Sequence, residues 1–345
     1  MPPASDSTLH WREPDWPAVS VSMVTYNHER HLARALDSVL NQQTNFRFEI
    51  VVGDDGSTDR TPDIVRAYAR MYPDVVIPIL HPKNNNDPVP GRTNNMTNLV
   101  NCRGKYTAML DGDDYWSDPH KLQRQFDVLE AHPEVNLSTH ATKVRHLNDA
   151  GEEYRPPRRY NESFLHPTTG IYDGSVIFEQ GLWFHISSIC FRTRAFPYFP
   201  PAFRKVLMAD YFLILQLSQG SALHYIDEEW SVYVKNDCSL TASGWLNHYI
   251  LNEGGLLDLQ TFESEFPGVR RGKFFQKRHA YQRIWIGYHL LTRRRAYWRG
   301  LRMLLRNGSW YVWKYPGDLL QPVYRKFQRF FPQQKPSASY DPRAV

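Results

Sequence analysis

The chain has 345 residues, of which 41% are apolar and 22% charged, and its formal net charge is +5 at pH 7. This composition excludes a disordered protein, because a chain of this size with 14% aromatic residues can bury a sizeable core. No stretch of about 18 uncharged apolar residues occurs, so no membrane-spanning helix is expected.

Cysteine usage and the N-terminal segment predict a cytoplasmic protein. The three cysteines, Cys102, Cys190 and Cys238, lie far apart and form no CxxC pair, which favours neither a disulfide framework nor a zinc site. The first 20 residues are polar and proline-rich, and they lack the basic and then apolar pattern of a secretory signal.

Patterns typical of strands alternate with patterns typical of helices along the first part of the chain. Buried strands are predicted at residues 18–26, 48–53, 75–80 and 106–110, where apolar and β-branched residues run together. Helical stripes follow the first, second and fourth strands, and we expect Asn27 and Thr61 to cap the first two helices. Residues 84–95 and 154–167 are expected to be irregular. The alternation predicts a largely parallel sheet covered by helices on both faces.

Two acidic clusters follow strands of this predicted sheet. GDDGSTD (53–59) comes directly after the second strand, and DGDD (111–114) comes directly after the fourth. Because the carboxyl ends of parallel strands meet at one edge of a sheet, both clusters can face one ligand. Either cluster alone is compatible with a solvated turn. Three carboxylates within four positions repel one another unless a cation or water separates them.

Three segments carry a resemblance to a known family. VSMVTYNHERHLARALDSVLNQ, EIVVGDDGSTDRT and GKYTAMLDGDDYWSDPHKLQRQ resemble, in this order and spacing, the nucleotide-sugar-binding half of family 2 glycosyltransferases. The strong likeness covers about residues 18–135, and a weaker one continues to about Trp245. It implies the α/β GT-A fold, with a Rossmann-like, mostly parallel sheet flanked by helices. We therefore expect a polar tail at 1–15, a GT-A domain at 16–245 and a helical extension at 246–345.

The resemblance also implies roles for the carboxylates of the DGDD cluster. Asp113 is expected to ligate Mg²⁺ or Mn²⁺, and Asp111 to contact the donor ribose or the metal. Such hard cations prefer oxygen ligands and neutralise a diphosphate leaving group. Asp114 is expected to support the site or to cap the next turn. Direct ligation of the metal by Asp114 is the alternative ranked below these two.

The donor base is expected near the end of the first strand. The resemblance places a uracil-type base at Thr25, Tyr26 and Asn27, with Asp54 accepting a hydrogen bond from it and Asp55 ranked second. The alternatives are that Tyr26 packs at the strand end and that Asn27 caps a helix. Neither role excludes contact with a base.

Candidates for the acceptor side and for contact with the diphosphate follow in three later segments. In VLMADYFLILQLSQG (206–220), Asp210 opens an apolar helix and resembles the general base of inverting relatives, although Ala209 replaces the usual Glu or Gly. The helix dipole is expected to depress the pKa of Asp210, and a simple first-turn acid is the alternative. Residues 181–196 look like a strand, with His185 as a strand histidine and the two serines that follow near the acceptor. Lys235 stands where relatives carry a Tyr-Arg-x-His loop over the diphosphate.

The C-terminal part is strongly basic. From Arg270 onward 18 Lys and Arg accompany two acids, a local charge of +16, whereas residues 1–269 carry −11. Apolar residues recur here at helical spacing between arginines: Tyr281, Ile284, Trp285, Tyr288 and Leu291, then Tyr297, Trp298, Leu301, Leu304 and Leu305. The stripe either lies on an anionic membrane surface or packs on the catalytic domain.

We expect a metal-dependent inverting glycosyltransferase that moves a sugar from a nucleotide-sugar to a hydroxyl of a glycan or lipid-linked glycan. The expected donor is a UDP-sugar. The setting that such proteins resemble is bacterial envelope or capsule polysaccharide synthesis, in the cytoplasm or at the inner face of the membrane. No nucleic-acid partner is expected, since no recognised module accompanies the basic charge. The alternatives are a catalytically impaired, membrane-surface scaffold and a phosphatase-like enzyme with Asp111 as nucleophile.

Overall fold

The computed structural model describes residues 16–82, 91–148, 150–161, 167–196, 199–235, 253–269 and 272–278, together with residues 280, 283, 301, 302 and 305. The chain divides into two compact units, residues 1–276 and 277–345. Most of the predicted basic helices lie outside the described residues, so what they contact stays a prediction. Among the described residues, no helix combines the length and apolarity that crossing a bilayer requires.

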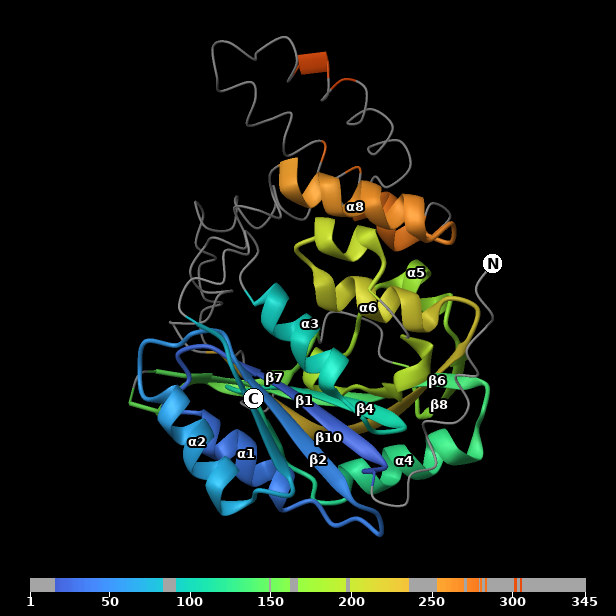
Figure 1. Cartoon of the computed structure of the whole chain (residues 1–345). Coiled ribbons are helices and arrows are strands. Elements are labelled where there is room, and N and C mark those ends of the chain that lie inside the picture. The colour runs from blue at the N-terminus through green and yellow to red at the C-terminus, as the bar shows by residue number, and fades with distance from the viewer. Residues whose placement is uncertain are drawn as a thin grey trace, which may run out of the picture. The chain divides into compact units, whose positions relative to one another are not determined.

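The first unit is built on one mixed sheet, shown in Figure 1. Its strands are β1 (Val19–Thr25), β2 (Phe48–Asp54), β3 (Val76–Leu80), β4 (Tyr106–Asp111), β5 (Tyr115–Trp116), β6 (Val135–Leu147), β7 (Glu153–Arg159), β8 (Gly170–Asp173), β9 (Cys190–Arg192) and β10 (Ala222–Lys235). The order is β3-β2-β1-β4-β9-β6-β10-β5, with β7 paired to β6 and β8 paired to β10.

The predicted parallel arrangement holds in the first half of this sheet. The strands β3, β2, β1 and β4 are parallel neighbours, whereas β9 is antiparallel to both β4 and β6. The prediction of an α/β fold is confirmed, and the second half adds antiparallel pairs that the sequence pattern did not resolve.

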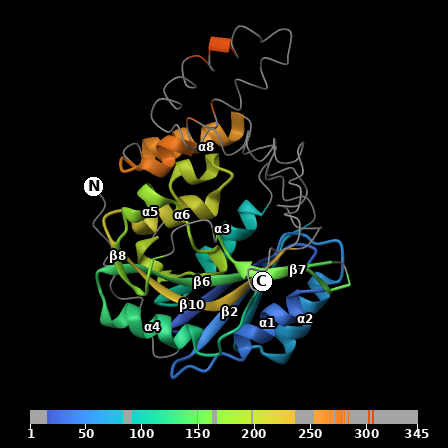
Figure 2. The same cartoon turned by 180° about the vertical axis from the view of Figure 1, so that it is seen from behind.

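Helices cover both faces of the sheet (Figures 1 and 2). One face carries α1 (Leu32–Leu40), α2 (Thr61–Met71) and α4 (Lys121–Ala131), and the opposite side carries α3 (Arg92–Asn101), α5 (Val176–Gln180), α6 (Ala209–Ser218) and α8 (Glu253–Glu265). Short 3-10 helices are η2 (Ile186–Ser188), η3 (Thr193–Ala195) and η4 (Pro201–Lys205). Each face therefore has its own apolar core, as the alternating pattern requires.

The two cores follow from the spacing of apolar residues. In α1 the predicted stripe of Leu32, Ala35, Leu36 and Val39 is buried against the sheet. On the other side α8 packs on α6, where the rings of Phe212 and Phe262 lie 6.2 Å apart. Because α8 belongs to this core, the first compact unit extends to Gln276, past the boundary predicted at residue 245.

The helix α3 is attached to the sheet by asparagine side chains. The Asn98 amide donates to the carbonyl oxygens of Met23 and Val51 at 2.8 and 3.1 Å, and the Asn94 amide donates to the Gly53 carbonyl at 2.8 Å. A Cβ at Gly53 would lie 2.0 Å from Asn94 Oδ1, so only glycine leaves room for this approach. These bonds fix the spacing of β1 and β2 close to their carboxyl ends.

Several local predictions are wrong. Asn27 does not cap α1, because it adopts φ +53° and the residue before α1 is His31. Thr61 is the first residue of α2 rather than its cap, and its hydroxyl accepts from the His28 backbone N–H at 2.8 Å. Part of each predicted irregular stretch is regular, since α3 begins at Arg92 and β7 occupies Glu153–Arg159. In β7, Pro156 and Pro157 are tolerated because the strand pairs on one side alone.

Lys121 at the start of α4 is a buried amine without a hydrogen-bond partner among the described residues. Its Nζ lies 3.7 Å from the centroid of the Trp116 ring. Burial lowers the pKa of this ammonium from 10.5 to about 7. The unfolded chain then holds a proton that the folded chain releases, so stability rises with pH between about 7 and 10.5.

We expect Lys121→Met to remove this rise. From pH 7 to 9 the free energy of unfolding of the unchanged protein should change with pH more positively than that of the variant, by up to about 1.4 kcal/mol per pH unit, because the contributions of the other titrating groups cancel in this difference. Urea unfolding at pH 7, 8 and 9 measures it, with Lys205→Met, at an exposed position, as the matched control. Equal slopes for the unchanged protein and Lys121→Met would contradict the assignment.

Candidate functional site

The carboxyl ends of β1, β2 and β4 meet at one edge of the sheet. In the parallel registers Thr25 lies opposite Asp54, and Val24 lies opposite Asp111. The two acidic clusters that follow β2 and β4 therefore leave the sheet side by side. The prediction that they share one edge is confirmed, and a ligand at this edge can contact both.

The loop after β2 is closed by two of the predicted base-binding residues. Asp54 is buried, and its carboxylate accepts from the Ser57 N–H at 3.1 Å and from the Ser57 hydroxyl. Asn27 Oδ1 accepts from the Thr58 N–H at 2.8 Å, while the Asn27 N–H donates to Ser57 Oγ at 2.8 Å. Both side chains shape the loop, so their predicted contacts with a base would come in addition to a structural role.

Thr25, Tyr26 and Asp55 surround the same loop. Tyr26 exposes 52% of its surface, so its ring is available to a ligand, whereas Thr25 is buried. The Asp55 N–H donates to the Thr25 carbonyl at 3.0 Å, and the Asp55 carboxylate accepts from the Gly91 N–H at 3.0 Å. Of the predicted donor-side residues, Tyr26 and Asn27 are exposed, and Tyr26 offers an aromatic ring.

The DGDD turn approaches β1 closely at Gly112. A Cβ at this position would lie 2.8 Å from Thr25 Oγ1 and 3.1 Å from His28 Nδ1. Both of these polar atoms are buried, and neither has a hydrogen-bond partner within the described part of the chain. The glycine between the two aspartates is therefore required by space, and the turn leaves polar atoms that a ligand could satisfy.

The first two carboxylates of the turn lie in different surroundings. Burial raises the pKa of Asp111 to about 8, and the neighbouring charges of Asp113 and Asp210 add to the rise. The Asp113 carboxylate lies 3.7 Å from His28 Nε2 and keeps 14% of its side chain exposed. Repulsion within this group is what a bound cation would relieve.

Asp114 joins three elements. Its Oδ2 accepts from the Ser187 hydroxyl at 2.5 Å in η2, and its Oδ1 accepts from the Val234 N–H at 2.9 Å in β10. Burial and then the charges of Asp113 and Asp111 raise the pKa of Asp114 well above its usual value. This carboxyl group therefore fixes the turn to η2 and β10.

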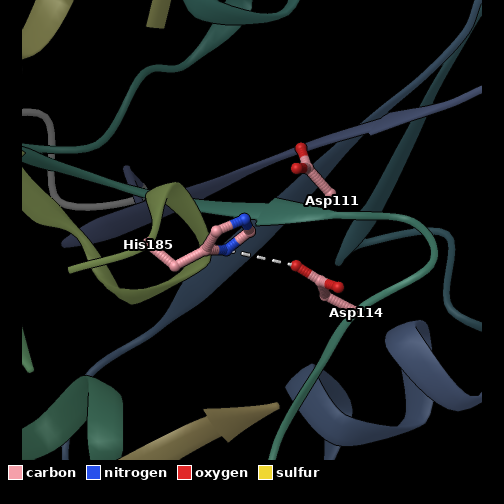
Figure 3. A group of neighbouring side chains, drawn as sticks. All are labelled: Asp111, Asp114 and His185. Carbon is pink, nitrogen blue, oxygen red and sulfur yellow. Dashed lines mark ion pairs between the residues drawn. The ribbon is translucent and has the colours of Figure 1, made fainter. Parts of the chain in front are cut away.

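His185 lies beside Asp114, as Figure 3 shows, with Nδ1 3.4 Å from Asp114 Oδ2. Its ring stacks on Tyr233, with centroids 4.2 Å apart, and Tyr160 packs edge-on at 5.0 Å. Burial lowers the pKa of His185 to about 3, so the imidazole is neutral at pH 7. The prediction of a strand histidine is wrong, because His185 precedes η2, and its Nδ1 accepts from the Ser187 N–H at 3.3 Å.

Two overlapping sets of side chains can hold a divalent cation. Within the described residues, ligand atoms of Asp111, Asp114 and His185 lie within 4.8 Å of one another (Figure 3). The predicted set is Asp111 with Asp113. Carboxylate oxygens suit Mg²⁺ and Mn²⁺, and the crowding that raises the pKa of Asp111 fits a cation at this position. Both Asp114 oxygens already accept hydrogen bonds, which favours the predicted set.

Asp210 lies in the first turn of α6, as predicted, and its charge acts on Asp111. The predicted direction of its pKa shift is wrong. Partial burial raises the pKa of Asp210, although its own N–H and that of Tyr211 oppose the rise. The residue nevertheless remains exposed to solvent. A carboxylate with a raised pKa is a stronger base, which suits proton abstraction.

Sequence reasoning missed His28 and gave Ser187 only a general place near the acceptor. His28 directly follows the predicted base-binding residues, but a lone histidine in a loop carries no spacing signal. Ser187 bonds to Asp114 across 73 positions of sequence, a pairing that folding alone creates.

Comparisons with known proteins relate part of this chain to a family of glycosyltransferases. The sequence profile described as glycosyl transferase family 2 matches residues 20–180. An uncharacterized protein of Mycobacterium tuberculosis is 30% identical over 219 residues, which are 62% of this chain and 58% of the relative. A minor teichoic acid biosynthesis protein of Bacillus subtilis is 33% identical over 121 residues, covering 34% of this chain and 26% of that protein. The chain thus spans little more than half of the mycobacterial relative.

Among solved structures, a mannosyltransferase of Pyrobaculum calidifontis in complex with GDP-Man and Mn²⁺ has a similar fold. Its TM-score is 0.52 at 18% identity, with 92% of this chain and 82% of that chain covered. At this identity the likeness concerns the fold alone, and it supports the GT-A-like α/β arrangement of the described strands and helices.

Proposed function

We propose that this protein, whose residues 20–180 match the glycosyl transferase family 2 profile, moves one sugar from a nucleotide-sugar to a hydroxyl of a glycan or lipid-linked glycan. The donor is a UDP-sugar, the reaction requires Mg²⁺ or Mn²⁺, and the configuration at the sugar C1 is inverted. The observation that carries the proposal is the meeting of Thr25, Asp54 and Asp111 at one sheet edge, within electrostatic range of Asp210.

The donor side consists of the β1, β2 and β4 ends. Tyr26 offers an open ring to the base, while Thr25, Asn27 and Asp54 shape the loop around it. Asp55, which bonds to Gly91, is the further candidate on this side. The loop selects one nucleotide base through hydrogen bonds, because a different base would leave buried polar groups of the loop without partners.

Asp111 and Asp113 would hold the metal and orient the diphosphate. The bound cation supplies charge neutralisation for the leaving diphosphate. Asp114 keeps both oxygens on protein donors and positions the turn, so it contributes without contacting the substrate.

Asp210 takes the proton from the acceptor hydroxyl. Three observations support this role. Asp210 belongs to α6, which covers the opposite face of the sheet from α2, the residue is exposed to solvent, and its pKa is raised. With the base on one side of the sugar ring and the leaving group on the other, a single displacement inverts C1.

The acceptor belongs to cell-envelope polysaccharide synthesis. The similarity to a minor teichoic acid biosynthesis protein supports a polymer of this kind. We further propose that the protein works in the cytoplasm, with its basic C-terminal residues in peripheral contact with an anionic membrane, at about 1 kcal/mol per basic residue near the surface.

A thermal-shift panel of UDP- and GDP-sugars, with and without Mn²⁺, tests the proposal. One donor should raise the unfolding temperature in the presence of Mn²⁺, and the rise should increase with donor concentration. Sugar transfer or slow donor hydrolysis should follow. Donor binding without turnover would favour a scaffold, whereas phosphate release from monoesters without donor binding would favour a phosphatase. Either result would overturn the assignment.

A further inference from the structure

A basic strip lies on one face of the sheet beyond the proposed site. It consists of Arg155 and Arg158 on β7, His146 on β6 and Lys235 at the end of β10. In the register, Arg155 lies opposite His146, and His146 lies opposite Lys235, so the three form one row across three strands. Arg158 lies in the neighbouring row with Val144 and Tyr233.

An irregularity in β7 brings both arginines to this face. Three positions separate Arg155 from Arg158, which would place them on opposite faces of a regular strand. Their partners in β6, His146 and Val144, are two positions apart and share a face, because the pairing shifts between them. The extra residue in β7 therefore turns both guanidinium groups to the side of Tyr233 and Lys235.

The opposite face of the same strands shows a different arrangement of charge. There Arg145 pairs with Glu153 at 3.0 Å, Lys143 pairs with Glu229 at 3.3 Å, and Arg159 pairs with Asp227. In the described part of the chain, Arg155 and Lys235 have no carboxylate partner, and each instead lies over a neighbouring tyrosine ring. In this respect Arg155 and Lys235 differ from the three cations of the opposite face.

The cations of the strip act on one another. The pKa of Lys235 is lowered first by partial burial and then by Arg158 and Arg155. The pKa of His146 is lowered by burial and then by Lys235, Arg155 and Arg158, with Glu153 alone opposing. Repulsion between these positive charges raises the free energy of the protein without a ligand. A bound anion with several oxygens would offset this repulsion.

Aromatic rings connect the strip to the proposed site. Tyr233, in the row of Arg158, stacks on His185, which lies 3.4 Å from Asp114. Tyr160, next to the end of β7, packs edge-on against both rings, with centroids 5.0 and 6.0 Å away. In the sheet order β10 and β6 lie beyond β4 and β9 from the donor-side strands, so the strip belongs to the acceptor half.

From this arrangement we infer that the basic strip binds a phosphate or diphosphate group carried by the acceptor, with the acceptor sugar on the Tyr233 and Tyr160 side. The inference rests on the proposed transferase function, and it specifies an anionic, phosphate-linked acceptor. Arginine provides the paired donors that phosphate oxygens require, and Lys235 adds a point charge at the end of the row nearest to Tyr233.

Geranyl diphosphate, a soluble prenyl diphosphate, is a suitable probe. Its binding to the full chain is measured by calorimetry in EDTA, so that a metal-dependent donor site cannot retain it. We expect the double variant Arg155→Ala, Arg158→Ala to bind at least about tenfold more weakly, and the double lysine variant at the same positions to recover part of the loss. Binding by the unchanged protein should fall as NaCl is raised. Both arginines are exposed, so thermal unfolding should not change.

The matched control is Arg66→Ala, Arg70→Ala, which removes the same charge from the exposed face of α2. An equal loss of probe binding in this control, or no loss in the strip variant, would overturn the inference. So would a strip variant that loses binding to phosphatidylglycerol vesicles, relative to phosphatidylcholine vesicles, while its affinity for geranyl diphosphate is unchanged. That result would assign the strip to the membrane surface.

Donor binding separates this inference from the proposed function. The thermal shift by a nucleotide-sugar with Mn²⁺ should be the same in the strip variant and in the unchanged protein. If the unchanged protein shows this shift but does not bind the probe, the strip assignment alone is wrong. If the shift is absent, the proposed function fails whatever the strip binds.

Discussion

Asp210→Asn should lower the rate of sugar transfer by about 10²- to 10⁴-fold, the range that a positioned general base contributes. The amide keeps the size and polarity of the carboxylate but cannot accept the acceptor proton. Partial burial raises the pKa of Asp210, so its carboxylate holds a proton more tightly than an ordinary aspartate and is the better base. The affinity for the donor should change little, because the donor-side residues lie on β1, β2 and β4.

Single-turnover transfer with the identified donor measures this effect, together with the Mn²⁺-dependent thermal shift as the readout of donor binding. Asp74→Asn, at an exposed turn between α2 and β3, is the matched control and should retain full activity. Transfer within tenfold of the unchanged protein would rule out Asp210 as the base. A parallel loss of donor binding would instead point to a role of Asp210 on the donor side.

Asp111→Asn and Asp113→Asn should each abolish the Mn²⁺-dependent part of donor binding and lower transfer by about 100-fold or more. A divalent cation of this kind takes one or two protein carboxylates with the substrate phosphates, so the loss of either ligand is not compensated. Asp114→Asn should behave differently. It replaces one of the two accepting oxygens by an NH2 donor, so either the Ser187 hydroxyl or the Val234 N–H loses its acceptor, at an expected cost of about 1–3 kcal/mol of folding stability.

Titration with Mn²⁺ at saturating UDP distinguishes the two ligand sets, and urea unfolding supplies the stability readout. Asp63→Asn, at an exposed position of α2, serves as the control for the loss of one negative charge. If Asp114→Asn and a His185→Phe variant lose Mn²⁺ affinity while Asp113→Asn retains it, the metal lies between Asp111, Asp114 and His185. That outcome would contradict the set proposed here.

The half of the fold that repeats a local pattern could be predicted from the sequence. The strands β1 to β4 and the helices α1, α2 and α4 have continuous apolar runs or helical stripes, which report burial directly. The shared edge of Asp54 and Asp111 followed from the parallel direction of these strands alone. By contrast, β7 contains two prolines and three arginines, and its strand character comes from pairing with β6.

The parts of the site that depend on distant contacts could not be predicted. Asp114 looked like a spare carboxylate of the turn, and its bonds to η2 and β10 involve residues 73 and 120 positions away. His185 looked like a strand residue because its neighbours are apolar, yet η2 turns the chain there. The pKa of Asp210 was assigned from the helix dipole, whereas burial by the surrounding protein has the larger effect.

The asparagine attachment of α3 has a chemical consequence. Hydrolysis of the Asn98 amide to a carboxylate would change the side chain by one functional group and leave its shape almost unaltered. The two carbonyl oxygens of Met23 and Val51 would then face an acceptor instead of a donor, and a negative charge would stand in a fully buried position. A carboxylate at this position would therefore weaken the attachment of α3 to β1 and β2.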